Sequence, residues 1–148
     1  MESSGKLVYG ELPIPKLKRG QVLVKVEAAS LNPSDLYFME GMYDDIVKIQ
    51  YPLVPGWEGS GTVVATGGGF MAWLVKGKRV AFTKADEGKE GEIEGFKLGG
   101  AYAEYAVTNG YQCVKLPDDV SFEEGASFFV NPMTAIGLLD VSLNKHGS

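Results

Sequence analysis

The sequence has little of what metal and thiol chemistry require. Its 148 residues include one cysteine and one histidine, Cys113 and His146. A zinc site needs three or four ligands from histidine, cysteine or carboxylate groups, so these counts argue against a zinc centre. One cysteine can form no intramolecular disulfide, and the shortage of histidine removes the usual serine and cysteine hydrolase arrangements. We therefore expect no metal site, an inert thiol at Cys113 within a strand and a solvated His146.

Long apolar runs and basic patches are also missing. No apolar run approaches the roughly 20 residues that cross a bilayer, and residues 1–5 lack the apolar core of a signal peptide. The formal net charge is −5, and the densest basic cluster, residues 16–19, is typical of a solvated turn. Nucleic acids and anionic membranes attract clustered lysine and arginine instead. We expect a soluble, cytoplasmic protein that binds neither.

Glycine, by contrast, is abundant, with 20 residues of 148 against an average near 7%. Between the glycines, apolar and polar side chains alternate, most clearly over residues 21–28, which predicts short, half-buried strands. We expect strands at 6–10, 21–28, 61–66, 78–82, 101–108 and 111–116. Short, closely spaced strands with few helices between them predict a mainly β fold with short helices, built as a small antiparallel barrel.

Capping signals predict three helices. Asn32 is followed by Pro33, an N-cap residue and a proline at the first helical position, so a short helix should begin there. Ser121 and Glu124 have the spacing of a capping box. Asn131 and a following proline repeat the first device and predict a helix that runs to about residue 144. The acidic segment 85–99 has no apolar period and is expected to be a mobile loop.

Two glycine clusters invite a nucleotide-binding interpretation, which their positions do not favour. Residues 56–61 precede a predicted strand, whereas a phosphate-binding glycine loop follows a strand and opens a helix. The cluster Gly67-Gly68-Gly69 is likewise predicted to have no helix after it. We interpret both clusters as turns.

Polar and aromatic side chains gather beside the predicted helix starts and glycine turns. They are Asn32, Ser34, Tyr37, Tyr43, Trp57, Asn131 and Thr134. Each also has an ordinary structural explanation, because asparagines cap helices and aromatic rings fill cores. The residues alone leave both interpretations open.

Several segments resemble a known family in order and spacing. AASLNPSD at 28–35, YPLVPGWEGSGTV at 51–63, GKRV at 77–80, GGAYAEY at 99–105 and the stretch 125–135 are similar to the GroES-like domain of medium-chain dehydrogenases/reductases. The resemblance implies a partly open antiparallel barrel. It makes residues 1–128 the substrate-side domain and residues 129–148 the start of a helical connection to a Rossmann domain, before which the sequence stops.

Two positions decide which branch of the family the sequence resembles. Zinc alcohol dehydrogenases have a cysteine where this chain has Asn32, and a histidine where it has Trp57. The pattern resembles instead the quinone oxidoreductases and the 2-enoyl thioester reductases, which use NADPH and no zinc. The resemblance therefore implies an NADPH-dependent reductase that transfers a hydride to a quinone or an activated double bond.

The same resemblance implies roles for individual residues. Catalysis is expected from Tyr43 as proton donor with help from Asn32, substrate binding from Trp57 and Asn131, and cofactor binding from Tyr37 and Thr134. The full-length enzyme is expected to be a homodimer that binds a small-molecule substrate. The 148 residues alone are expected to be inactive and to bind NADPH weakly. The alternatives are a non-catalytic GroES-like module, which a Trp57 that fills the cleft would favour, and a free-standing co-chaperonin.

Overall fold

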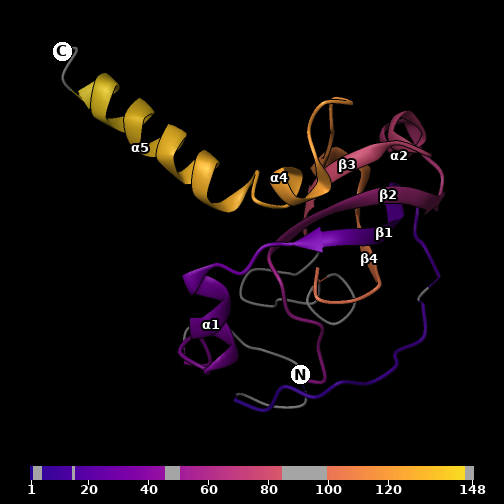
Figure 1. Cartoon of the computed structure of the whole chain (residues 1–148), viewed down its shortest axis with the longest axis horizontal. Coiled ribbons are helices and arrows are strands. Elements are labelled where there is room, and N and C mark those ends of the chain that lie inside the picture. Colours follow the sequence, from indigo (N-terminus) through magenta and orange to yellow (C-terminus); the bar gives the residue numbers. More distant parts are fainter. Residues whose placement is uncertain (2–4, 15, 46–50, 85–99, 146–148) are drawn as a thin grey trace.

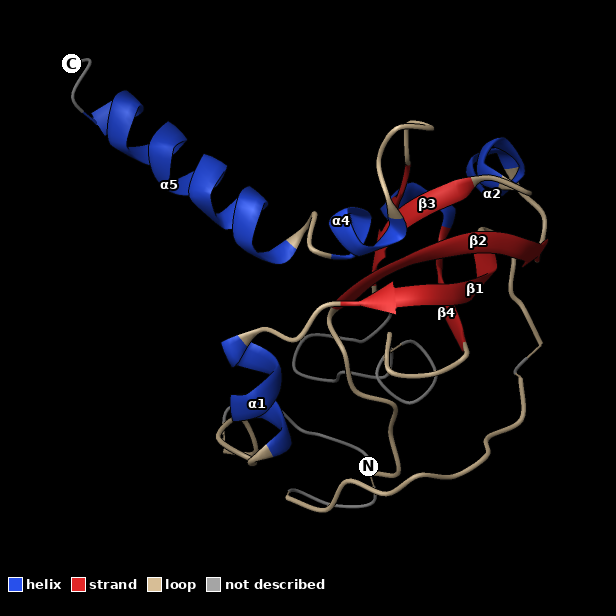
Figure 2. Ribbon diagram, in the orientation of Figure 1, coloured by secondary structure: helices blue, strands red, loops and turns tan. Residues whose placement is uncertain are grey.

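An antiparallel sheet forms the body of the protein (Figures 1 and 2). The computed structural model describes residues 1, 5–14, 16–45, 51–84 and 100–145. Within them the sheet has five strands in the order β4-β1-β2-β3-β5. Their bounds are β1 Gln21–Ala29, β2 Glu58–Thr66, β3 Arg79–Thr83, β4 Tyr105–Asn109 and β5 Cys113–Lys115. This arrangement confirms the predicted mainly β fold, an open sheet with short helices.

Alternation along the central strand β1 produces the core. Val22 and Val24 are fully buried, and Val24 pairs with Val63 of β2 and Ala106 of β4. The core cluster consists of Val22, Val24, Val63, Ala72, Val75, Val80, Phe82, Ala101 and Ala106. Burial of these apolar side chains is the main favourable term in the stability of the sheet.

The sheet curls until its two ends approach each other. Thr108 of β4 donates a side-chain hydrogen bond of 2.6 Å to the backbone oxygen of Thr83, at the end of β3. The pairing of β1 with β2 needs glycine at position 61, because a Cβ there would overlap the backbone oxygen of Lys25. The curled sheet is thus a partly open barrel, as the family resemblance implies.

Two sequence expectations are wrong. Residues 6–10 form no strand: only Lys6 makes a bridge, Tyr9 is fully exposed, and among the described residues no strand pairs with residues 7–10. The glycine cluster at 67–69 does precede a helix, α2 (Phe70–Val75), whose N-cap is Gly69. The helix lacks a side-chain cap and is stabilised instead by Ala72 and Val75, which pack into the core.

The predicted helix starts are confirmed with small shifts. They correspond to α1 (Pro33–Met39), α4 (Phe122–Ala126) and α5 (Val130–Lys145), and a 3₁₀ turn, η1 (Gly110–Gln112), is added. The capping box of α4 is present, with Ser121 and Glu124 each bonding the other's backbone N–H. Helix α4 packs against β1 and β2, whereas α5 projects away from the body (Figure 1). Segment 85–99 and His146 lie outside the described residues.

Strand boundaries also differ from the sequence expectations. β2 begins at Glu58, three residues before position 61, because Glu58, Gly59 and Ser60 pair with Thr83 to Ala81 of β3. β4 and β5 are shorter than expected and begin at Tyr105 and Cys113. The early start of β2 has a consequence for the site, since it makes Glu58 a sheet residue.

Candidate functional site

Asn32 sits where β1 has ended and α1 begins. As the N-cap residue of α1 it has an extended backbone, and its side chain is only 3% exposed. The side-chain nitrogen Nδ2 donates to Ser30 Oγ at 3.0 Å and to Glu58 Oε1 at 3.2 Å. The amide nitrogen of Asn32 therefore has two acceptors within the protein.

Glu58, the first residue of β2, is fully buried and accepts four hydrogen bonds. Oε1 accepts from Ser30 Oγ at 2.8 Å and from Asn32 Nδ2. Oε2 accepts from the backbone N–H groups of Phe129 at 2.6 Å and Val130 at 2.9 Å. Hydrogen bonds to an ionised acceptor are stronger than those between neutral groups, and a buried charge requires them. Sequence reasoning missed this residue.

Helix α5 brings Asn131 to the same place. Its Nδ2 donates to Asn32 Oδ1 at 2.9 Å, across 99 positions of sequence. Thr134 lies one turn further along α5, where its hydroxyl donates to the backbone oxygen of Val130 at 2.6 Å. We call Ser30, Asn32, Glu58 and Asn131 the polar cluster.

Asp35 connects the polar cluster to the residues beside it. One carboxylate oxygen accepts the backbone N–H of Asn32 at 2.8 Å, and the other accepts that of Trp57 at 3.1 Å. Burial raises the pKa of Asp35 above its usual value, although both hydrogen bonds act in the opposite direction. The Tyr102 hydroxyl donates to the backbone oxygen of Ser30 at 2.9 Å. Burial, followed by the negative charge of Asp35, raises the pKa of Tyr102, so this hydroxyl remains a donor.

Three aromatic rings lie on the other side of Asp35. Trp57 packs edge to face on Phe38, with ring centroids 5.6 Å apart, and on Tyr43 at 6.5 Å. Phe38 is buried, whereas Tyr43 and Trp57 are partly exposed. The ammonium of Lys84 lies 4.2 Å from the centre of the Trp57 ring, a cation–π contact. We call Phe38, Tyr43 and Trp57 the aromatic group.

The structure therefore brings four of the six predicted site residues into two adjoining groups. Asn32 and Asn131 are bonded in the polar cluster, and Tyr43 and Trp57 touch in the aromatic group. Tyr37, on α1, is 48% exposed. Within the described part of the chain, no hydrogen bond or ring contact joins Tyr37 or Thr134 to either group.

Metal-binding side chains do not gather in the described ranges. No group of three or more histidine, cysteine, aspartate or glutamate residues there could hold a metal ion. Burial raises the pKa of the Cys113 thiol to about 12, which leaves it protonated at neutral pH. Among the helices that the structure describes, none is long and apolar enough to cross a membrane.

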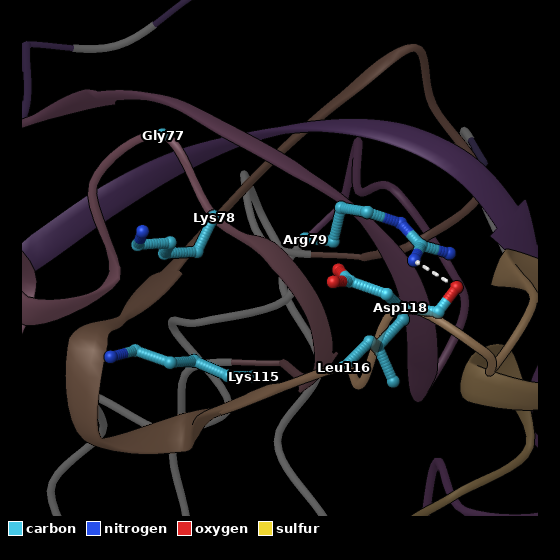
Figure 3. A pocket seen from close by; sticks show the side chains of 6 residues that line it. All are labelled: Gly77, Lys78, Arg79, Lys115, Leu116 and Asp118. Carbon is cyan, nitrogen blue, oxygen red and sulfur yellow. Dashed lines mark hydrogen bonds between the residues drawn. The ribbon is translucent and has the colours of Figure 1, made fainter.

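Two hollows are present outside the polar cluster and the aromatic group, and Tyr102 lines the larger one. A groove of about 900 Å³ runs between the N-terminal segment 7–14 and the sheet. A pocket of about 370 Å³ is lined by Gly77, Lys78, Arg79, Lys115, Leu116 and Asp118 (Figure 3). Arg79 there donates to the backbone oxygens of Pro117, Asp118 and Val120. Lysines beside an edge strand such as β5 commonly prevent edge-to-edge association, so this pocket needs no ligand to explain it.

Comparison with known proteins identifies the family of the chain. The alcohol dehydrogenase GroES-like domain family matches residues 18–118. An alcohol dehydrogenase of Geobacillus stearothermophilus is 35% identical over 152 residues, covering 93% of this chain and 44% of that protein. A quinone oxidoreductase of Lama guanicoe is 35% identical over 128 residues, covering 86% of this chain and 34% of that protein.

A solved structure supports the same relationship. A mycobacterial protein in complex with NADPH has a TM-score of 0.71 and 31% identity, covering 94% of this chain and 37% of that one. The chain thus spans less than half the length of each of these three proteins.

Proposed function

Because the chain belongs to the alcohol dehydrogenase GroES-like domain family of the medium-chain dehydrogenases/reductases, we propose that it is the substrate-side domain of a zinc-free, NADPH-dependent reductase. Its substrates in this proposal are quinones or α,β-unsaturated carbonyl compounds, including enoyl thioesters. The quinone oxidoreductase among its relatives and the NADPH bound to the mycobacterial protein support this assignment.

The observation that carries the zinc-free assignment is the set of donors around Glu58. Zinc enzymes of the family have a cysteine and a histidine where this chain has Asn32 and Trp57. Here the glutamate beside those positions accepts hydrogen bonds from a hydroxyl, a side-chain amide and two backbone N–H groups. These donors use the lone pairs that a metal would need, and the site is satisfied without one.

We propose that the described residues contact the nicotinamide end of NADPH, as the family resemblance implies, and not its pyrophosphate. Asn131 and Thr134 are exposed on α5, beside the polar cluster. Of the two glycine turns, one leads into strand β2 and the other into the six-residue helix α2. The second turn has the order strand, glycine turn, helix, but β3, which follows α2, pairs antiparallel with β2. It is therefore not the parallel βαβ unit that grips a pyrophosphate. We propose that a further nucleotide-binding domain of the full-length enzyme supplies that part.

In the proposed reaction, NADPH supplies the hydride, and negative charge develops on the carbonyl or quinone oxygen of the substrate. A donor has to meet this charge. Tyr43 is partly exposed, and its ring is held by Phe38 and Trp57. A phenol carries its proton at neutral pH and can donate it to the oxygen. The amide nitrogen of Asn32 has two acceptors within the protein, so its proposed part is to position neighbouring groups.

The substitution Tyr43→Phe tests the proposed donor in the full-length enzyme. It retains the ring contacts and removes the hydroxyl, and loss of one preorganised donor lowers kcat by about 10²–10³-fold. Turnover of an enone and of a quinone with NADPH is the measurement, and Tyr105→Phe, on an exposed part of β4, is the control. Unchanged turnover would remove Tyr43 from the mechanism. Absence of NADPH-dependent turnover in the unmodified enzyme would favour the non-catalytic module instead.

A further inference from the structure

Glu58 differs from the other members of the polar cluster in one chemical respect. An ionised carboxylate accepts hydrogen bonds and cannot donate them, whereas each asparagine amide has one end that donates and one that accepts. Glu58 is fully buried, and both of its oxygens face donors. Any amide that contacts Glu58 must therefore turn its nitrogen toward it.

This restriction passes along the cluster. Asn32 turns Nδ2 to Glu58, which leaves its Oδ1 facing α5. Asn131 must then turn its own Nδ2 to that oxygen, so its Oδ1 points away from Asn32. Reversal of the Asn32 amide would place two acceptors against each other in a buried site, which is costly, and reversal of Asn131 alone would place two acceptors against each other at the edge of that site. One carboxylate thus fixes the orientation of two amides.

We propose that Glu58 is a positioning residue that acts through this hydrogen-bond relay, Glu58–Asn32–Asn131. Its second oxygen binds the backbone N–H groups of Phe129 and Val130, at the point where α5 begins. Glu58 thereby holds the first turn of α5 against the sheet and determines which atom of Asn131 is left to contact a ligand. The amide oxygen of Asn131 is left to accept a hydrogen bond from an N–H or O–H group of that ligand.

The relay predicts an unusual result when its polarity is reversed. Glu58→Gln supplies one acceptor and one donor where two acceptors are needed, and Asn131→Asp places an acceptor against Asn32 Oδ1. We expect Asn131→Asp alone to lower the melting temperature by about 2–4 °C, because two acceptors then face each other and Glu58 prevents Asn32 from turning round. Glu58→Gln alone should cost less, because Asn32 and Asn131 can both turn round. In the double variant Asn32 can turn round, accept from the glutamine and donate to the aspartate.

We therefore expect the double variant to melt at a higher temperature than Asn131→Asp alone. The control pairs Glu58→Gln with Asn109→Asp. Asn109 is more buried than Asn131, and its Nδ2 donates to Tyr111 Oη and Gln112 Oε1, outside the relay. Its effect should add to that of Glu58→Gln. Losses that simply add in the Glu58/Asn131 pair as well would overturn the relay.

A second measurement needs no variant at position 58. In the unmodified protein, both Nδ2 hydrogens of Asn32 should exchange slowly with solvent in ¹⁵N NMR spectra, because their nitrogen has two acceptors in a buried site. Fast exchange of both would contradict the proposal. The role of the relay in catalysis rests on the proposed function, but melting and exchange are measured without substrate or NADPH. A failed relay would leave the reductase assignment intact, and an inactive enzyme would leave the relay intact.

Discussion

At the residue scale, burial decides what the ionisable side chains of this domain can do. The sequence predicts Asn32 as a site residue only through a family resemblance, and it gives no direct sign of Glu58, since glutamate is usually exposed. The position of Glu58, between Trp57 and Gly59 at the start of an apolar strand, is the signal that could have identified it. The hydrogen bonds around it join residues more than 70 positions apart in the sequence, and local sequence patterns do not indicate such contacts.

The thiol of Cys113, at the start of β5, is expected to be unreactive. Since its pKa is raised to about 12, almost no thiolate is present at pH 8, and the thiolate is the reactive form. We expect iodoacetamide to alkylate the native protein at pH 8 much more slowly than the urea-unfolded protein, as followed by mass spectrometry. A cysteine introduced at the exposed position Ser142 should react rapidly in both states. Equal rates at Cys113 in the two states would show that its thiol is accessible.

Asp35 makes a pH-dependent contribution to stability with a defined sign. Burial raises its folded-state pKa above 3.8, so the folded protein binds this proton more tightly than the unfolded chain does. The free energy of unfolding should therefore fall as pH rises from about 4 through the folded-state pKa of Asp35. Urea unfolding of the unmodified protein and of Asp35→Asn between pH 3.5 and 6 measures this contribution. The variant should show a flatter profile, while Asp118→Asn, at an exposed site, should retain the original slope.

At the scale of elements, local sequence signals predict some helices and strands correctly and fail for others. The capping box of α4 and the alternation of β1 are local, and both appear in the structure as expected. Alternation at residues 6–10 predicts a strand that does not form, because pairing depends on a neighbour that the local sequence does not describe. Helix α2 is missed for the converse reason, since its packing into the core stabilises it without any local cap.

Two glycines in different elements should respond in opposite ways to alanine. At Gly137, in α5, an added Cβ meets nothing within 4 Å, so Gly137→Ala should stabilise the helix by about 0.5–1 kcal/mol. At Gly61, in β2, the added Cβ would overlap the backbone of Lys25, so Gly61→Ala should lower the melting temperature of the sheet markedly. Hydrogen exchange of α5 and thermal melting of the sheet are the respective measurements. Identical effects of the two substitutions would contradict the close approach of the β1 and β2 backbones at Gly61.

At the scale of the whole molecule, the described residues form one sheet with a long helix attached. Along α5 the side chains of Met133, Ile136, Leu138, Leu139 and Leu143 are all more than half exposed. Apolar surface of this kind typically marks a site of contact with another part of a protein or with a partner. It agrees with the relatives, of which this chain spans less than half.

The affinity for the cofactor also depends on the whole molecule. Because the described glycine turns do not form a pyrophosphate cradle, we expect the 148 residues alone to bind NADPH with a Kd in the millimolar range or weaker. Fluorescence titration with NADPH measures this affinity, and isothermal calorimetry provides an independent value. Micromolar binding would mean that the domain itself contains most of the cofactor site. The proposal that a further domain binds the pyrophosphate would then be wrong.

The attachment of α5 also has a mechanical meaning. A helix of 16 residues is about 24 Å long, and it is held at its first turn by the carboxylate of Glu58. Such a helix is a lever with its pivot at the polar cluster. A rotation of about 10° at the pivot would move the far end by roughly 4 Å, from the same helix geometry. The buried carboxylate of Glu58 thus determines the direction in which the whole of α5 extends.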